Sequence, residues 1–213
     1  FRSSTFRDSN GLWEQYRVED VATPEGFAAN PSLVLDFYNQ RRRQLLTCKP
    51  NAGHQGLAAL EKTFDVRIIT QNVDNLHEQA GSTKVLHLHG ELMKYCSVYD
   101  LNTAYPISPD NPDLHWGDKA PDGGQRRPFI VWFGEPVPMI EPAIEWVMEA
   151  DIFAVIGTSL NVYPAAGLLA YVKKNTPIYL IDPKEVKAYR NDIHFIKATA
   201  SEGVRKLTEV LTQ

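Results

Sequence analysis

The stretch that decides the fold is residues 66–77, which read VRIITQNVDNLH. Its first five residues are rich in β-branched side chains and form a short run typical of a buried strand. Amides and a carboxylate follow at once, where the run ends. Parallel sheets bind ligands at the carboxyl ends of their strands, so this change from apolar to polar predicts a strand that leads into a binding site.

Five further short runs of β-forming residues lie downstream, at residues 85–88, 129–133, 151–156, 177–181 and 193–196. Apolar residues at helical spacing predict helices around them, at residues 32–46, 53–64, 142–149, 165–174 and 201–211. Apolar strands that alternate with helices indicate an α/β fold, with a Rossmann-like parallel sheet covered by helices on both faces.

Residues 97–127 break this pattern, because they are rich in Pro, Asp, Asn and Gly and have little periodicity. Such a stretch is long for a plain loop, so we expect an irregular insertion or part of a small lobe. We expect one domain over residues 1–213. Its small lobe would cover about residues 14–50 and 91–127, and the large lobe would be the remainder.

Composition limits the function. A formal net charge of -4 argues against broad nucleic-acid binding, and the one basic cluster, residues 41–43, is expected to be a solvated helix face. No apolar run approaches the length of a membrane span and no signal peptide is visible. Cys48 and Cys96 form no CxxC pair, so neither a disulfide framework nor a cysteine zinc site is predicted. The simplest expectation is a reducing, cytoplasmic setting.

His87 and His89 lie at the end of the second run, before Gly90. Alternation along a strand places both histidines on one face. They could be a structural pair bonded to backbone, or His89 could be a general base exposed at the strand end. A metal site that also uses Cys96 is a third interpretation, for which no fourth ligand occurs at a typical spacing.

Small and polar residues also follow the fourth and fifth runs. Residues 157–159, Gly-Thr-Ser, would let the backbone approach a phosphate or ribose closely, although many α/β turns have the same pattern. Asp182 could accept hydrogen bonds from adenosine ribose hydroxyls or serve as a turn residue before Pro183.

Taken in order, these segments resemble the signatures of the sirtuin (Sir2) family. The matching stretches read TFRDSNGLW at 5–13, TQNVDNLH at 70–77, HGE at 89–91, WFGE at 132–135 and GTS through YPAAG at 157–167. Each alone is weak evidence, but together they follow the family's order and cover nearly the whole chain.

The resemblance implies an NAD-dependent protein lysine deacylase, with NAD consumed as a co-substrate. The acyl-lysine oxygen would attack the nicotinamide ribose, releasing nicotinamide and finally O-acyl-ADP-ribose and free lysine. His89 matches the base that activates a ribose hydroxyl. The implied partners are acylated lysine side chains of proteins or peptides, with no nucleic acid and no membrane.

The resemblance also assigns cofactor contacts. Asn72 and Asp74 match residues that line the nicotinamide pocket, and therefore also count as catalytic candidates. Gln71 matches a ribose contact and Arg7 the arginine of the cofactor loop. The residues that match the phosphate and adenosine side are Gly157, Thr158, Ser159 and Asp182. The family usually has Asn at the last of these positions.

In sirtuins an extended peptide pairs with two backbone segments, a form of β-augmentation. The matching segments contain Gly134 and Glu135, and Asn161 and Val162. Phe133 and Val162 would wall the tunnel around the lysine stem, although Phe133 could equally be a core aromatic.

Tyr38 and Arg41 lie three apart on a predicted helix, so their side chains share one face. A phenol beside a guanidinium forms a good carboxylate receptor. The pair resembles the Tyr-x-x-Arg motif of sirtuins that remove succinyl and malonyl groups, and Ala22 matches the small residue that widens their acyl pocket. We therefore expect desuccinylase and demalonylase activity beside deacetylase activity.

The sequence departs from the family at two places. Sirtuins commonly hold zinc with four cysteines between the HG and FGE motifs, where this chain has only Cys96, so we expect no zinc. A strand and a glycine-rich phosphate loop precede the TFR motif in the family, whereas only residues 1–4 are printed there. The strand and the glycine-rich loop are therefore missing from the sequence as printed. We expect a protein that truly lacks them to be inactive.

Three other functions stay open. The chain could be a non-catalytic module that binds ADP-ribose or acyl-peptides, or an NAD-dependent ADP-ribosyltransferase that traps the activated ribose with another nucleophile. A dehydrogenase is the weakest alternative, because no GxGxxG fingerprint is present in the printed sequence.

Overall fold

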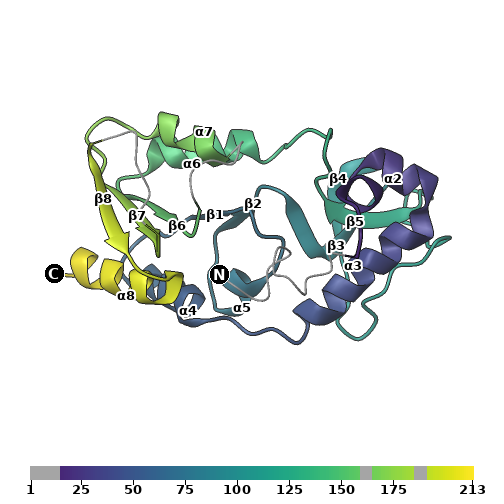
Figure 1. Ribbon diagram of the computed structural model, residues 1–213, viewed down its shortest axis with the longest axis horizontal. Coiled ribbons are helices and arrows are strands. Elements are labelled where there is room, and N and C mark those ends of the chain that lie inside the picture. The colour runs from purple at the N-terminus through teal and green to yellow at the C-terminus, as the bar shows by residue number, and fades with distance from the viewer. Residues whose placement is uncertain (1–14, 159–164, 185–190) are drawn as a thin grey trace.

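The computed structural model describes residues 15–158, 165–184 and 191–213. Three small sheets follow one another along the longest axis of the molecule (Figure 1). The sheet β6-β7-β8 occupies one end, β4-β3-β5 the other, and the pair β1-β2 lies between them. None of the described helices is long and apolar enough to cross a membrane.

Two of the sheets are parallel and form the large lobe. Their strands are β1 (Ile68–Thr70), β2 (Val85–His87), β6 (Phe153–Ile156), β7 (Ile178–Asp182) and β8 (Ile193–Lys197). Each coincides with a predicted apolar run, so the α/β fold is confirmed. The carboxyl ends of these strands form one edge of each sheet, and the predicted site residues come directly after them in the sequence.

Helices cover both faces of these strands (Figure 1). One face packs on α6 (Ile140–Glu149), α7 (Ala165–Leu168) and the 3-10 turn η3 (Leu169–Tyr171). The other packs on α4 (Ala52–Ala59), η2 (Leu60–Lys62) and α8 (Ala200–Leu211). Buried aliphatic side chains fill the two layers between, as burial of apolar surface requires.

The small lobe combines three helices with an antiparallel sheet. The helices are α1 (Val18–Val21), α2 (Pro24–Ala29) and α3 (Pro31–Leu45), and the strands are β3 (Gly90–Ser97), β4 (Asp100–Pro106) and β5 (Arg126–Ile130). Asn30 caps α3 by accepting a bond from the Leu33 amide, with Pro31 at the first helical position. Their shared core is a hydrophobic cluster that includes the aromatic side chains of Phe27, Phe37, Tyr38, Tyr95 and Trp132.

One strand prediction was wrong in this lobe. The strand predicted at residues 129–133 is β5, which begins and ends three residues earlier and runs antiparallel to β3. Residues 97–127 were expected to form an irregular insertion or part of a small lobe, and they belong to the small lobe, where β4 pairs with β3 in a hairpin. The sequence did not predict β4, because none of its residues is buried and apolar and polar residues therefore do not alternate along it.

The arginine run at residues 41–43 was wrongly predicted to be a solvated face. Arg42 is fully buried, and its guanidinium donates to the carbonyls of Leu92 and Pro112 and to the side chain of Asn39, each at 2.8 Å. Only Arg43 is exposed, where it pairs with Asp113. Arg42 therefore fastens α3 to β3 and to the loop before β5.

Candidate active site

The loop after β1 holds Asn72 by its backbone at both ends. Its amide donates to the Thr70 hydroxyl at 3.0 Å, and its carbonyl accepts from His87 at 3.0 Å. Its carboxamide is exposed. Asp74, two residues on, accepts a bond from the Leu76 amide that begins the short helix α5 (Leu76–Gln79). The loop is therefore ordered, while the side-chain carboxamide of Asn72 and the second carboxylate oxygen of Asp74 stay available for a ligand.

His89 lies where the chain passes from β2 to β3. The next residue has to be glycine, because a Cβ on Gly90 would come within 2.1 Å of the Phe129 carbonyl oxygen, at a φ of +91°. The carbonyl of His89 accepts from the Val131 amide at 2.9 Å, which fixes its backbone against the segment after β5. Burial lowers the pKa of His89, so its ring is neutral and able to accept a proton.

His87 does not share this role. It is buried, and its ring bonds to the Asn72 carbonyl and to the Glu78 carboxylate. The structural interpretation of the histidine pair therefore holds for His87. The metal interpretation with Cys96 is not supported: within the described ranges, the acids that approach His87 are Glu78 and Glu91, and Cys96 is a buried thiol whose pKa burial raises to about 11.

Tyr38 and Arg41 lie side by side on α3, as the helical spacing predicts. The Arg41 guanidinium carbon is 6.0 Å from the centre of the Tyr38 ring. Burial lowers the pKa of Arg41 to about 9, and the nearby Tyr38 and Asp74 only partly offset this effect. The structure thus brings the predicted acyl-group receptor close to the predicted nicotinamide pocket.

A tight turn presents Phe133. The Glu135 amide donates to the Trp132 carbonyl at 3.0 Å, and Gly134 has a φ of +89°, which favours glycine at this turn position. Phe133 is 67% exposed and its amide donates to the Ala22 carbonyl at 3.0 Å. An aromatic ring held this far out of the core is suited to contact a ligand, and the interpretation of Phe133 as a core residue was wrong.

The Glu135 side chain has a structural function that the sequence did not reveal. Its carboxylate accepts from both terminal nitrogens of Arg127, at 2.8 and 2.9 Å, and from the Trp132 amide at 2.8 Å. The Arg127 guanidinium also lies over the Trp132 indole, 3.6 Å from the ring centre. Of this residue only the backbone is left for a peptide substrate.

The edge formed by β6 and β7 carries the predicted adenosine side. The Gly157 amide donates to the Ile181 carbonyl at 3.0 Å, which brings Gly157 and Thr158 beside Asp182. One oxygen of Asp182 accepts from the Lys184 amide at 2.7 Å, so the turn interpretation is correct and the second oxygen stays accessible.

The expected site residues therefore fall into two groups. Gln71, Asn72, Asp74 and His89 lie near the small lobe with Ala22, Tyr38 and Arg41, whereas Gly157, Thr158 and Asp182 lie along the β6–β7 edge. Arg7, Ser159, Asn161 and Val162 lie outside the described residues. Sequence reasoning missed Trp132, whose indole Nε1 needs a buried partner and finds it in the Tyr38 hydroxyl.

A parallel sheet with polar groups at its carboxyl edge, flanked by a second lobe, is typical of nucleotide-binding α/β proteins. Within that class the chain belongs to the Sir2 family, whose model matches residues 3–164. A relative from Bacteroides thetaiotaomicron named NAD-dependent protein deacylase is 58% identical over 212 residues, or 98% of this chain and 91% of the relative. A relative of the same name from Helicobacter pylori is 54% identical, over 98% of this chain and 90% of its own length.

Solved structures agree. A Sir2 homologue in complex with NAD has a TM-score of 0.80 and 37% sequence identity, over 97% of this chain and 84% of its own. A mutant Sir2 homologue with bound ADP-ribose has a TM-score of 0.81 and 36% identity, over 98% of this chain and 86% of its own.

Proposed function

We propose that this member of the Sir2 family is a protein lysine deacylase that removes succinyl and malonyl groups as well as acetyl groups. Family membership, together with relatives named NAD-dependent protein deacylase at up to 58% identity, makes the chain an NAD-dependent enzyme whose substrates are acylated proteins. The finer specificity depends on one observation, the adjacent Tyr38 and Arg41.

The groups at the carboxyl edges fit NAD. The exposed Asn72 carboxamide, with Asp74 and Gln71 beside it, would hold the nicotinamide and its ribose. Gly157, Thr158 and the open oxygen of Asp182 would face the phosphates and the adenosine ribose, with Arg7 and Ser159 added from the sequence. When bound, NAD supplies the ribose carbon that releases nicotinamide and accepts the acyl oxygen.

His89 would act as the general base. Its ring is half-buried and kept neutral by burial, and among the described residues no side chain hydrogen-bonds it. An imidazole nitrogen in this state can take a proton from a ribose hydroxyl without first losing one of its own. Asn72 and Asp74 would bind the nicotinamide ring, which is the leaving group.

Tyr38 and Arg41 would receive the carboxylate at the end of a succinyl or malonyl group. Burial keeps the phenol protonated by raising its pKa to about 12, so Tyr38 can donate a hydrogen bond. The desolvated guanidinium of Arg41 gains most from a nearby anion, because burial without full compensation is what lowers its pKa. An acetyl group has no carboxylate for these two side chains to bind, and we propose that the site accepts it as well.

The peptide would pair with Gly134 and with the segment containing Asn161 and Val162. The amides of Phe133 and Glu135 are already used, so the Gly134 amide and the carbonyls of this turn are what a peptide strand can bond. Phe133 would cover the lysine stem. These contacts read backbone rather than sequence, which suits many protein targets.

Acyl specificity is tested by mass spectrometry of acetyl-, malonyl- and succinyl-lysine peptides incubated with NAD and the full-length protein. We expect loss of all three acyl groups and none with His89→Ala. Arg41→Met should abolish the preference for succinyl, whereas the matched variant Arg43→Met should not, because Arg43 pairs with Asp113 on the surface.

The alternatives give different results in the same assay. Nicotinamide release without deacylation would point to an ADP-ribosyltransferase, and binding of ADP-ribose without turnover would point to a binding module. A succinyl preference that Arg41→Met leaves intact would refute the assigned receptor. We also propose a cytoplasmic location on the sequence reasoning above, which imaging of a tagged copy would test.

A further inference from the structure

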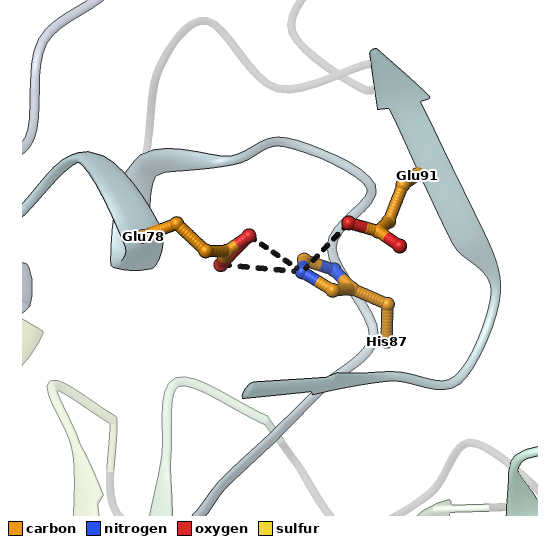
Figure 2. A group of neighbouring side chains, drawn as sticks. All are labelled: Glu78, His87 and Glu91. Carbon is orange, nitrogen blue, oxygen red and sulfur yellow. Dashed lines mark hydrogen bonds and ion pairs between the residues drawn. The ribbon is translucent and has the colours of Figure 1, made fainter. Parts of the chain in front are cut away.

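A buried histidine beside the site has acceptors on both sides. The Nδ1 atom of His87 lies 3.0 Å from the Asn72 carbonyl oxygen, and Nε2 lies 3.0 and 3.2 Å from the two carboxylate oxygens of Glu78. Figure 2 shows Glu78 and Glu91 converging on the same nitrogen, with Glu91 at 3.8 Å. Only 8% of His87 is exposed, so water cannot replace these partners easily.

The donor count assigns the protonation state. A carbonyl and a carboxylate only accept, and a neutral imidazole has one N–H donor. With Glu78 ionised, both bonds can therefore exist together only when both nitrogens of His87 carry protons. Burial opposes ionisation of Glu78, but its hydrogen bond to His87 and the nearby charge lower the pKa of this carboxyl overall. Loss of one proton would leave either the Asn72 carbonyl or the Glu78 carboxylate facing a lone pair.

One of these bonds reaches the reaction site. His87 holds the carbonyl of Asn72 while Thr70 holds its amide, so the two together fix the peptide groups on both sides of the Asn72 Cα, from which the exposed side chain projects. We propose that His87 is a positioning residue: as an imidazolium ion clamped by Glu78, it sets the Asn72 loop for productive binding of the nicotinamide end of NAD. This inference rests on the proposed role of Asn72 and Asp74.

The surrounding charges favour this state. Burial opposes a charge on His87, but its bonds to Glu78 and to the Asn72 carbonyl, with the charges of Glu78 and Glu91, raise its pKa overall. Glu91 is shared with Lys94, at 2.9 Å. His77, on the same helix as Glu78, adds little opposing charge, because burial lowers its pKa.

Two cations thus face two carboxylates, and the cluster is balanced without a further ion. Its ligand atoms, all within 4.8 Å of one another, could also surround a divalent cation. An ion there would displace the Nε2 proton, so the two states exclude one another and can be told apart by experiment.

The sign of the pH dependence follows. A raised pKa means that His87 stays charged at pH values where a free histidine is neutral, and the clamp is lost as the pH rises through that pKa. NAD binding should therefore weaken on the alkaline side. Glu78→Gln removes the main partner charge and should move this alkaline limb to lower pH, with little effect below the limb.

The measurement is the pH profile of kcat/KM for NAD, with a saturating acyl-peptide, for wild type, Glu78→Gln and His87→Gln. We expect His87→Gln to raise the KM for NAD by about tenfold and to abolish the limb. The matched controls are Glu145→Gln and His194→Gln, both exposed and remote from the loop, and their profiles should equal that of the wild type.

Nitrogen NMR of the wild-type protein needs no variant to fold. Both His87 ring nitrogens should have shifts of protonated imidazolium near neutral pH and titrate together with the alkaline limb. A neutral His87 at that pH, or an alkaline limb unchanged by Glu78→Gln, would overturn the proposal. So would a limb that disappears on treatment with a chelator, because a bound ion would then hold the loop.

A wrong assignment of the nicotinamide pocket would give a different result from a wrong assignment of His87. Asn72→Ala and Asp74→Asn should nearly abolish nicotinamide release at every pH. If they do not, the nicotinamide pocket is wrongly assigned. If they do, and His87→Gln still matches the wild-type profile, only the positioning role of His87 is refuted.

Discussion

The indole Nε1 of Trp132 donates a hydrogen bond to the phenol oxygen of Tyr38 at 3.0 Å, joining the turn after β5 to helix α3. Since the Tyr38 oxygen accepts this bond, its own proton points to another acceptor. Among the described residues no side chain or carbonyl accepts it. The Tyr38 hydroxyl can therefore still donate, and we propose that it does so to an acyl carboxylate that binds beside Arg41.

Tyr38→Phe should lower activity on the succinyl peptide more than activity on the acetyl peptide. We expect kcat/KM for the succinyl peptide to fall by about 10- to 100-fold, with a smaller loss for acetyl, because only the carboxylate uses the hydroxyl. Trp132 also loses its acceptor, at a cost of about 1–3 kcal/mol of folding stability. Tyr99→Phe is the control, since Tyr99 is 75% exposed. Equal losses for both peptides would contradict the assignment.

Ala22→Leu should narrow the acyl pocket. Ala22 is buried in the same cluster as Tyr38 and Trp132, and its carbonyl anchors Phe133. Added methyl groups would fill the space of a long acyl chain, so we expect desuccinylation to drop while deacetylation persists, with an overpacking cost of about 1–3 kcal/mol. Steady-state rates on both peptides check this. Ala28→Leu, on the exposed part of α2, should change neither.

Apolar runs and helical periodicity predicted the large lobe well, because β1, β2 and β7 are mostly buried and therefore consist largely of apolar residues. The small lobe was harder. The exposed β4 has no alternation to detect, and Arg42 looks solvated beside two other arginines. The helical phase was informative, since Arg42 lies four residues after the buried Tyr38 and seven after the buried Leu35.

The residues of the site were predicted by type and position, but their partners were not. Glu135 binds Arg127 and His87 binds Glu78 across separate elements, and such long-range pairs leave no local pattern. Glu135 can therefore contribute to the proposed peptide site only through its backbone. Resemblance identifies candidate residues for the site, whereas only the structure reveals what holds them.

Arg127→Met should destabilise the turn that presents Phe133. It leaves the buried Glu135 carboxylate without its cation, which typically costs about 3–5 kcal/mol. We expect a lower Tm and a higher KM for the peptide, with a smaller change in the KM for NAD. The double variant Arg127→Met with Glu135→Leu should recover part of the stability. A double variant less stable than the single one would contradict this account.

Arg42→Met should loosen the small lobe as a whole. It removes the bonds to Leu92, Pro112 and Asn39 from a fully buried site, and we expect a loss of about 3–5 kcal/mol in urea unfolding. Arg43→Met, its exposed neighbour, should cost about 1 kcal/mol or less. Similar losses for the two variants would mean that burial of Arg42 does not matter to stability.

The acid side of the pH profile should report His89. Burial lowers its pKa below the ordinary value of 6.5, and the base works only when neutral. Deacylation should therefore persist as the pH falls to that value and decline only below it. The readout is kcat/KM for the acyl-peptide against pH, with His194→Gln as a matched histidine control. A decline that begins above 6.5 would argue against a desolvated base.

The junction at His89 and Gly90 joins a strand of the large lobe to the first strand of the small lobe. The proposed base is therefore part of a connection between the two halves rather than a residue carried by either one. A rotation of one lobe against the other would be expected to turn the backbone near the proposed base. Binding of an acyl-peptide would then also align the imidazole of His89. Variants that loosen either lobe would be expected to misalign this ring first.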